Sequence, residues 1–512
     1  MQTTAWNYKR KVLALIAVIG MIRLIIAFTV QLANDESYYW LYSQHLKLNY
    51  FDHPPLIAFW IRLSTVNLQL QDYTGFIRLS SVISCSIATW FLFKCVSLIS
   101  NERAGWFAAC LYNASFYAGI TAGIFVMPDS PQMIFWTGSL WLIASILKNE
   151  NSWKYWLLFG ISTGLCIMSK VHGVFIWIGV GFYILFFKRV WLSNPRVYVS
   201  VLISFIICLP ILLWNIRYNF ITYQFNEGRI NIYGVTHDWF YLLKESCGQL
   251  LINNPINVVL VLLALFTFRK YVLKQYTALT VYKFIGLLHA GILLVISSYK
   301  ETLPHWSGPA YVTLLPLAAV YLDTKTKNKT AITPQLSVGL HVFVLLAIIL
   351  LIYCYPGNFG VPSGKTMGYG DITLDMQGWK QGGEKFDSIY TTYQQKKIIA
   401  QNTPVICAKW WGAHIEYYFC RPENIQMIGL GNMMDLHEYT WMNGLRKDSV
   451  NMQQAFCIVP SDEFYNVRKT YSNYYNNVDS ITNIQLLRNG NPSHSFYVYL
   501  LSGWKGKIPV VQ

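Results

Sequence analysis

The stretch KVLALIAVIGMIRLIIAFTVQLA at residues 11–33 decides the fold class, because it is an almost unbroken apolar run of the length that a helix needs to cross a bilayer. Similar runs recur along the 512-residue chain. The composition agrees, since 54% of the residues are hydrophobic and only 12% are charged, about half the charged fraction usual in soluble proteins. The sequence therefore argues against a water-soluble enzyme and predicts a mainly α-helical, polytopic membrane protein.

Eleven membrane spans are predicted. They are residues 11–33, 76–99, 104–125, 130–147, 154–170, 172–188, 197–216, 254–269, 279–298, 306–322 and 335–356. The fifth and sixth touch at Lys170-Val171-His172-Gly173, so they can also be read as one long apolar stretch. The first run is too long for a cleaved signal peptide and lacks a small-x-small cleavage site, so it is expected to remain as a span.

The distribution of charge predicts the orientation of the spans. With a cytoplasmic N-terminus, the inner loops hold mostly basic residues: Lys9, Arg10, Lys11, Arg103, Lys148, Lys154, Lys188, Arg189, Arg196, Arg269, Lys270, Lys274, Lys325, Lys327 and Lys329. Most carboxylates of the membrane part lie in the outer loops, which is the positive-inside arrangement of a multi-pass protein of the cytoplasmic (inner) membrane. The formal net charge of +16 is thus explained by topology. No basic aromatic patch of nucleic-acid type appears, so no nucleic-acid partner is expected.

An odd number of spans places residues 357–512 outside the cytoplasm, as a second domain after a membrane domain of residues 1–356. Short apolar strands are predicted at 404–408, 424–429, 455–459 and 495–502, with helix-like stretches at 384–399 and 462–471. The sequence therefore predicts a small extracytoplasmic α/β domain. Cys407 and Cys420 lie in it and are a candidate disulfide.

The first outer loop, residues 34–75, is unusually rich for a connector. It begins Asn34-Asp35-Glu36-Ser37-Tyr38-Tyr39-Trp40 and continues to Tyr50-Phe51-Asp52-His53-Pro54-Pro55. The apolar segment 55–68 is too short to cross a bilayer and suits a helix that lies in the interface. Two adjacent acids followed by three aromatic residues predict that Asp35 lies in a dry pocket, rather than on a solvated loop.

A further acid, Asp129, lies in the short outer loop Met127-Pro128-Asp129-Ser130-Pro131. Because Asp is a favoured N-cap and Pro suits a first helical turn, capping explains this residue as well as catalysis does, and the two roles can coexist. Basic groups recur on the same outer side: His53, Lys170, His172, Arg217, Arg229, Lys300 and His305. Arg217 and Lys300 taken singly suit side chains that extend to lipid headgroups. As a set facing Asp35 and Asp129, the cations suit a phosphate bound near the membrane surface.

These motifs resemble, in chain order, those of the dolichyl-phosphate-mannose-protein mannosyltransferase superfamily. The resemblance is carried by Asp35 to Trp40, Tyr50 to Pro55, Met127 to Pro131, Ser169-Lys170-Val171-His172-Gly173, Leu213-Trp214-Asn215 and Leu303-Pro304-His305-Trp306. It covers about residues 9–356 and is closer to the bacterial branch, which includes the aminoarabinose transferase acting on lipid A. The stretch Asp375-Met376-Gln377-Gly378-Trp379 is similar to a weaker motif of the same bacterial proteins.

The resemblance implies a C-type glycosyltransferase that moves one sugar, of hexosyl or pentosyl type, from a polyprenyl-phosphate donor to an acceptor lipid, glycan or protein on the outer face of the membrane. It implies that Asp35 is the catalytic base and that Asp129 supports the acceptor or the base. The expected substrate-binding residues are Glu36, Tyr38, Tyr39, Asp52, His53, Lys170, His172, Arg229, Lys300 and His305. His53 departs from the family, since some relatives have Lys there, and its charge depends on pH near neutrality.

Elementary chemistry agrees with this reading and leaves alternatives open. Sugar transfer from a phosphodiester needs a base for the acceptor hydroxyl, cations for the departing phosphate and exclusion of water. A secondary transporter is the alternative from another class, although no internal repeat or matched pair of broken helices appears. A ligase or flippase of lipid-linked glycans is the alternative within lipid-sugar biology. No metal site is assigned, because no helix-type ligand spacing supports one, and a divalent ion stays an open alternative.

Overall fold

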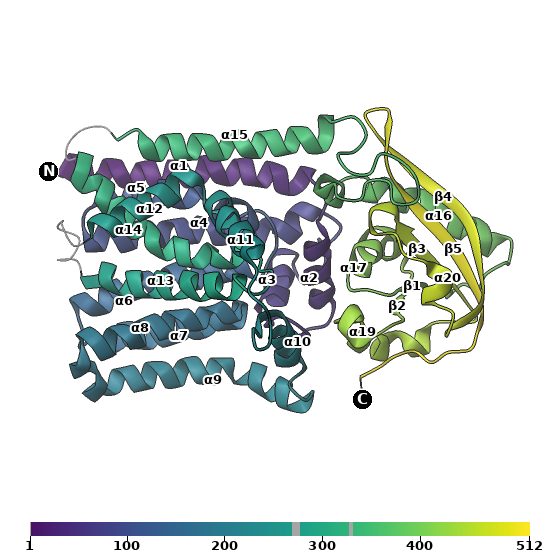
Figure 1. Cartoon of the computed structure of the whole chain (residues 1–512), viewed down its shortest axis with the longest axis horizontal. Coiled ribbons are helices and arrows are strands. Elements are labelled where there is room, and N and C mark those ends of the chain that lie inside the picture. The colour runs from purple at the N-terminus through teal and green to yellow at the C-terminus, as the bar shows by residue number, and fades with distance from the viewer. Residues whose placement is uncertain (1, 269–276, 327–330, 512) are drawn as a thin grey trace. The chain divides into compact units, whose positions relative to one another are not determined.

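A computed structural model describes residues 2–268, 277–326 and 331–511 of the chain. The predicted inner-loop cations Arg269, Lys270, Lys274, Lys327 and Lys329 lie outside the described residues. The chain forms two compact units (Figure 1). Unit 1 comprises Met1–Thr29 and His45–Val344, and unit 2 comprises Val30–Gln44 and Leu345–Gln512. Each unit is described by itself.

Unit 1 is built from helices. They are α1 (Gln2–Thr29), α3 (Leu56–Ser64), α4 (Thr74–Ile99), α5 (Glu102–Ala114), α6 (Asp129–Lys148), α7 (Trp153–Ser169), α8 (Val174–Phe187), α9 (Pro195–Arg217), α10 (Ile221–Ile230), α11 (Trp239–Ile252), α12 (Pro255–Thr267), α13 (Thr277–Ser297), α14 (Gly308–Thr326) and α15 (Thr333–Cys354), whose last turns enter unit 2. A helix lies at each predicted span. Five of the described helices are long and apolar enough to cross a membrane, or six if the bent pair α11 and α12 forms one span. The mainly helical, multi-pass class is confirmed, and the number of eleven spans stays a prediction.

Several helix ends differ from the predicted spans. Helix α1 ends at Thr29 and not at residue 33. The fifth and sixth spans are separate helices, because Lys170 is extended and residues 171–173 form a 3-10 turn between α7 and α8. The predicted span 104–125 breaks at Ser115, which is extended, and continues as a π-helix, η1 (Tyr117–Thr121). These breaks fall where the predicted site motifs lie.

The predicted interfacial segment 55–68 contains a shorter helix. Helix α3 ends at Ser64, because Val66, Asn67 and Leu68 have φ angles of 50°, 53° and 72°, in the left-handed region that a helix does not tolerate. Its side chains Ile57, Ala58 and Ile61 are buried. Only one face of α3 is therefore covered by protein, as expected of an amphipathic helix.

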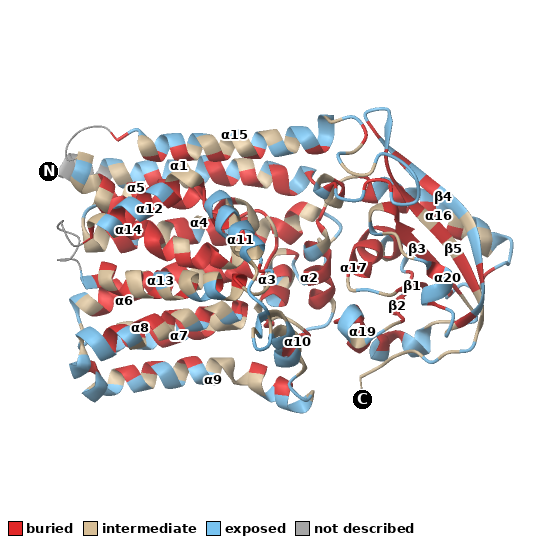
Figure 2. Cartoon of the chain, viewed as in Figure 1, coloured by how far each residue is buried: buried red, intermediate tan, exposed pale blue. Residues whose placement is uncertain are grey.

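The helices of unit 1 differ in how much of their apolar surface they bury (Figure 2). In α4, 50% of the most apolar stretch is buried, against 28% in α9 and 22% in α15. On α9, large side chains such as Leu202 and Phe205 are more than half exposed. Leucine and phenylalanine exposed along whole helix faces suit contact with lipid acyl chains. Inside the bundle, small polar residues pair between helices, as in the 2.8 Å contact between Thr163 and Ser204.

Unit 2 is a small α/β domain, as predicted. Its main helices are α2 (Asn34–Gln44), α16 (Trp379–Gln395), α17 (Gly412–Ile415), α18 (Met433–Leu436), α19 (Tyr439–Arg446) and α20 (Val467–Thr470), with a π-helix η7 (Glu416–Cys420). Its strands are β1 (Val405–Cys407), β2 (Met427–Gly429), β3 (Gln454–Pro460), β4 (Tyr475–Arg488) and β5 (Asn491–Trp504), in the order β2-β1-β3-β5-β4. Strand β1 pairs in parallel with β2 and β3, and β5 pairs antiparallel with β3 and β4. Helix α2 belongs to this unit, which the linear division at residue 356 did not anticipate.

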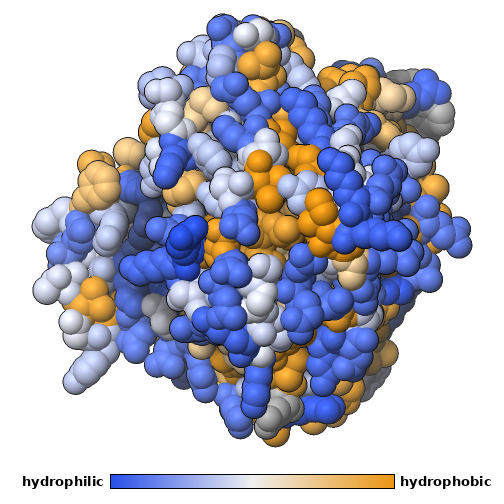
Figure 3. All heavy atoms as spheres, turned by 90° about the vertical axis from the view of Figure 1, so that its right-hand side faces the viewer, coloured by the Kyte–Doolittle hydropathy of each residue, from blue (hydrophilic) through white to orange (hydrophobic). Residues whose placement is uncertain are grey.

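Sequence analysis missed strand β4 and misplaced two helices. The predicted helix 384–399 starts earlier, as α16, and the predicted helix 462–471 is a 3-10 turn followed by the short α20. Strand β4 was missed because much of its length is exposed and polar. Hydrophilic side chains are also the most numerous on the face of the molecule seen in Figure 3. Asn489-Gly490, with φ angles of 48° and 80°, closes the hairpin between β4 and β5 and was the available signal.

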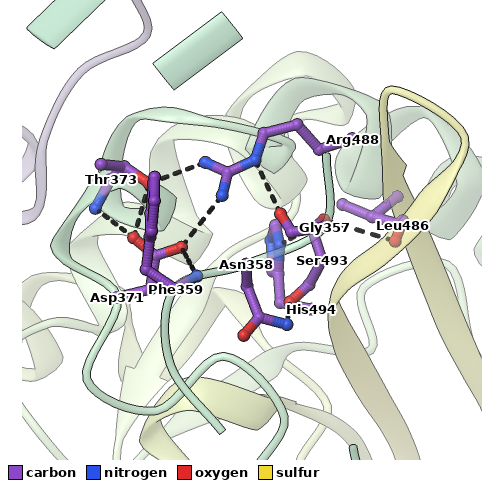
Figure 4. Close-up of polar contacts among 9 residues, drawn as sticks. All are labelled: Gly357, Asn358, Phe359, Asp371, Thr373, Leu486, Arg488, Ser493 and His494. Carbon is purple, nitrogen blue, oxygen red and sulfur yellow. Dashed lines mark hydrogen bonds and ion pairs between the residues drawn. The ribbon is translucent and has the colours of Figure 1, made fainter. Parts of the chain in front are cut away.

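A buried ion pair ties the chain that follows α15 to the end of β4 (Figure 4). The Arg488 guanidinium contacts Asp371 Oδ2 at 3.0 Å and donates to the Gly357 carbonyl at 2.7 Å. Asp371 also accepts the backbone N–H of Phe359 at 2.9 Å. The predicted disulfide is not formed, since Cys407 and Cys420 are both buried free thiols.

Candidate active site

The centre of the candidate site in unit 1 is a buried ion pair between Asp129 and Lys170. Lys170 Nζ lies 2.9 Å from both carboxylate oxygens of Asp129. The side chains are 1% and 5% exposed, respectively. Asp129 is the first residue of α6, and Lys170 follows the last residue of α7 in an extended conformation, which ends that helix. Two breaks in apolar helices therefore bring opposite charges together.

Asp129 does not cap its helix, which corrects one of the two roles predicted for it. The N-cap position is Pro128, and no side chain caps α6. The Asp129 carboxylate is instead occupied by Lys170 and by the Tyr117 hydroxyl, which donates to Oδ1 at 2.8 Å. Sequence analysis missed Tyr117, because nothing in its local sequence indicates the π-helix from which it projects.

Three residues of the predicted basic set, His53, Arg229 and His305, interact electrostatically with this pair or with each other. The charges of Asp129, Lys170 and Arg229 all act on His53 and on His305. Burial lowers the pKa of His53, which Asp52 opposes and Lys170 reinforces. Burial, and then Lys170, lowers the pKa of His305 to about 4. Both imidazoles are therefore neutral near pH 7 and offer a single ring N–H each.

An aromatic wall adjoins the histidines. The His172 ring lies 5.4 Å from that of His289 on α13 and 6.0 Å from that of Trp306. Phe175 stacks on His289 with ring centres 4.2 Å apart. Arg229 on α10 lies over Trp306 at 4.9 Å. His289 was missed from the sequence, although a histidine inside an apolar span is itself a signal of function.

Two predicted cations have other partners. Lys300 Nζ donates to the backbone carbonyl of Gly228 at 2.6 Å, at the exposed end of α10. Arg217 is exposed at the end of α9 and lies over Tyr218 at 5.6 Å. Their contacts suit a role in holding helix ends rather than one beside Asp129.

The second group of predicted residues lies at the start of α2 in unit 2. Glu36 is buried and its Oε2 accepts the Ala33 backbone N–H at 2.9 Å, so it caps its own helix in the manner of a capping box. Asp35, by contrast, is exposed. Within unit 2, the prediction that Asp35 lies in a dry pocket is therefore wrong. Adjacent residues of a helix point in different directions, and here the Glu36 side chain points into the unit while that of Asp35 points out of it.

The weaker motif at residues 375–379 holds the segment that leads into α2. Asp375 Oδ1 accepts the Asn34 backbone N–H at 3.1 Å. His414 Nε2 pairs with the Leu32 carbonyl at 2.8 Å, and the Trp379 ring stacks on His414 at 3.7 Å. Desolvation raises the pKa of Asp375 to about 7, opposed by the Asn34 hydrogen bond and reinforced by the charges of Asp35 and Glu36. Three carboxylates thus meet at one helix start.

The tyrosines predicted to bind substrate pack inside unit 2. The Tyr38 ring lies edge-on to Trp410 at 5.3 Å and to Tyr42 at 4.9 Å. Tyr39 and Tyr42 rings lie 5.6 Å apart. Both predicted tyrosines are buried, so their rings stabilise the placement of α2.

The two groups differ in the side chains that they offer. The residues of unit 2 offer an exposed carboxylate, Asp35, next to a carboxyl that titrates near neutrality. Those of unit 1 offer an ion pair, an arginine and neutral imidazoles. Among residues 2–268, 277–326 and 331–511, the structure contains no cluster of three or more metal-ligating side chains.

Comparison with known proteins gives matches to a family model, to a curated relative and to solved structures. Residues 52–214 match the family model of dolichyl-phosphate-mannose-protein mannosyltransferases. The chain is 25% identical over 186 residues to lipid A galacturonosyltransferase RgtD of Rhizobium johnstonii, which covers 36% of this chain and 38% of that protein. The structure of ArnT from Cupriavidus metallidurans in the apo state matches with a TM-score of 0.63 at 13% identity, over 97% of this chain and 98% of that one. ArnT bound to undecaprenyl phosphate matches with a TM-score of 0.62 at 11% identity, over 96% and 98%.

The resemblance inferred from the motifs is confirmed. The family match contains Asp52, His53, Asp129 and Lys170, and the fold match extends over both units. The chain therefore contains a region that matches the family model of dolichyl-phosphate-mannose-protein mannosyltransferases, within a fold like that of ArnT.

Proposed function

We propose that this protein is a membrane glycosyltransferase that moves one sugar from a polyprenyl-phosphate donor to an acceptor on the outer face of the cytoplasmic membrane. The observation that carries the proposal is the buried pair of Asp129 and Lys170, surrounded by Arg229, His53 and His305, within the family-matching part of the chain or beside it. The solved ArnT complex, which holds undecaprenyl phosphate, supports the same donor class by its likeness in fold.

The reaction is a displacement at the anomeric carbon of the sugar. Asp35 accepts the proton of an acceptor hydroxyl, the acceptor oxygen bonds to the anomeric carbon, and the bond from that carbon to the phosphate oxygen breaks. The polyprenyl phosphate leaves with both bonding electrons, as a phosphate monoester. Positioned base catalysis and cations around the leaving phosphate accelerate such a step. The exposure of Asp35 in unit 2 suits access by an acceptor hydroxyl.

The contacts divide the proposed phosphate-binding work unequally. Lys170 already contacts both oxygens of Asp129, so its positive charge is largely balanced. The Arg229 guanidinium lies over the rings of Phe225 and Trp306. Neutral rings do not cancel its positive charge. We therefore assign the main charge contact with the donor phosphate to Arg229, with His53 and His305 as neutral N–H donors.

The acceptor class is a finer part of the proposal. RgtD is named for transfer of galacturonosyl groups to lipid A, and the resemblance to the bacterial branch points to the same acceptor class. Lipid A, a glycolipid, is thus the first acceptor to test, before soluble glycans or proteins. Asp52 and His172 complete the proposed substrate-binding set. The proposed topology places the N-terminus in the cytoplasm and residues 357–512 outside it.

The proposal is tested by transfer in reconstituted vesicles. The purified protein is supplied with synthetic undecaprenyl phosphates that carry a hexose, a hexuronic acid or an aminopentose, together with lipid A, and products are identified by mass spectrometry. Appearance of glycosylated lipid A together with free undecaprenyl phosphate supports the transferase. Movement of unaltered donor across the vesicle membrane without any glycosylated product would instead support a flippase or transporter.

A further inference from the structure

A buried arginine in the first apolar helix has no role in the proposed phosphate site. Arg23 lies within α1 and is 2% exposed. Its Nε donates to the Gly119 carbonyl at 3.1 Å, and its Nη1 donates to Asn113 Oδ1 at 3.0 Å. None of the ion pairs among residues 2–268, 277–326 and 331–511 includes it. A charge held in an apolar helix by neutral acceptors alone indicates a special local demand.

The acceptors of Arg23 lie on either side of the break after α5. Asn113 is itself oriented, because its Nδ2 donates to Thr89 Oγ1 at 3.0 Å and to the Ala109 carbonyl at 2.9 Å. Gly119 lies in the middle of the π-helix Tyr117–Thr121. A Cβ atom on Gly119 would lie 2.4 Å from the His341 ring, so α15 also closes on this turn. Contacts from α1, α5 and α15 therefore hold this π-helix. π-Helices are rare in proteins overall, but many of those that occur lie at functional sites.

The π-helix points Tyr117 at Asp129. The Tyr117 hydroxyl donates to Asp129 Oδ1 at 2.8 Å, and the side chain is fully buried. Its ring lies flat against Gly308 at the start of α14, since a Cβ atom there would lie 2.2 Å from ring Cγ. The ring is thus confined by α14, and the π-helix from which it projects is held by the bond from Arg23 to the Gly119 carbonyl.

We propose that Tyr117 is a positioning residue for the transfer reaction, which orients the Asp129 carboxylate, and that Arg23 and Gly308 act through it. This inference rests on the proposed function. Lys170 alone leaves the plane of the Asp129 carboxylate free to rotate. A single ammonium at equal distance from both oxygens fixes their distance to Nζ but not the orientation of that plane. The phenol supplies a second direction at Oδ1. Hydrogen bonds to charged groups are among the stronger ones in proteins.

The first test compares matched tyrosine variants. Tyr117→Phe removes the hydroxyl and keeps the ring, and Tyr282→Phe makes the same change at a buried tyrosine whose hydroxyl donates to the Leu140 carbonyl at 2.6 Å. With Tyr117→Phe, kcat should fall about 10-fold to 100-fold, as expected for loss of a bond to a charged group. Donor KM should stay within about twofold, because the phosphate contacts are untouched. Unchanged kcat in folded Tyr117→Phe protein, or an equal loss in Tyr282→Phe, would overturn the proposal.

The second test asks whether Gly308 and Arg23 act through Tyr117. Gly308→Ala should lower kcat as Tyr117→Phe does, whereas Gly291→Ala, on α13 with no atom near its added Cβ, should not. In the Tyr117→Phe background, Gly308→Ala and Arg23→Gln should each cost little more kcat, since their effect is already lost. Fully additive losses would refute the coupling.

A third measurement separates this inference from the transferase proposal. Hydrogen exchange of the full-length protein reports the Ala122 amide, which donates to the Tyr117 carbonyl at 2.9 Å. Arg23→Gln should speed exchange over residues 117–122, and Tyr282→Phe should not. Unchanged exchange would refute the anchoring role even if transfer is observed. Faster exchange in Arg23→Gln, together with a wild-type protein that transfers no sugar, would support the anchor and reject the transferase instead.

Discussion

Replacing Lys170 by Met breaks the ion pair at the centre of unit 1 and leaves the Asp129 carboxylate buried. At 2.9 Å the two charges attract by about 6 kcal/mol with an effective dielectric constant of 20. Much of this is offset by desolvation, and loss of one partner of a buried pair typically costs about 3–5 kcal/mol of stability. Lys170→Met should therefore lower the free energy of unfolding by about this amount, in addition to any loss of donor binding.

The matched control is Lys188→Met. Lys188 Nζ lies 2.8 Å from Glu150 Oε1, but both side chains are about one-third exposed. Solvent screens such a pair, so its loss should cost no more than about 1 kcal/mol. Asp129→Asn should be destabilising like Lys170→Met, because each leaves one charge buried alone, and the double variant should be less unstable than the sum of the two.

The assay is denaturant unfolding of the full-length protein in detergent, followed by near-ultraviolet circular dichroism, with binding of undecaprenyl phosphate measured in parallel. If Lys170→Met unfolds at the same denaturant concentration as the wild type, or if Lys188→Met is destabilised as much as Lys170→Met, the reasoning from burial is refuted. If only phosphate binding changes, Lys170 is chiefly a donor contact and its pairing with Asp129 is weak.

Three more outcomes are expected. Asp35→Asn should fold and bind donor but lose about 100-fold to 10,000-fold in transfer rate, as for loss of a positioned base, whereas Glu36→Gln should mainly destabilise α2, which thermal unfolding checks; near-normal turnover of Asp35→Asn would remove it as the base. Because the pKa of Asp375 is raised to about 7 from 3.8, the folded protein holds a proton that the unfolded chain releases. Stability should therefore fall as pH rises from about 4 to about 7 and stay low above it, and Asp375→Asn should flatten this slope in unfolding measured across that range. Cysteine labelling after residue 360 should succeed in intact spheroplasts, and labelling only after the cytoplasmic membrane is permeabilised would contradict the topology.

The sequence predicted the membrane class, the positions of the helices and the small α/β domain, because each follows from the local period and length of apolar runs. It also placed Asp129, Lys170, His53 and His305 on one side of the membrane, and the structure brings these four together. Helix breaks at Lys170 and at Pro128 were visible as motifs. Local sequence carries such information because breaks and polar residues in apolar helices are rare.

Other features depend on contacts between distant segments. Whether Asp129 caps its helix or pairs with Lys170 is decided by the approach of α7, and a lone Asp-Ser-Pro sequence fits either. Which of Asp35 and Glu36 faces inward depends on the direction of α2, which residues 375–379 and His414 set from more than 300 residues away. The edge strand β4 was hidden by its polar, exposed face.

The sequence by itself determined that this chain lies in a membrane, where its helices run and which residue types could handle an anionic, lipid-linked substrate, because hydrophobic length and charge sign act over a few residues at a time. Only the tertiary structure decided that α2 folds with the C-terminal domain, that Arg23 bonds Gly119, and that Tyr117 contacts both Asp129 and Gly308. The physical reason is that buried polar groups must be satisfied by whichever partners the fold brings near, and those partners lie far away in the chain.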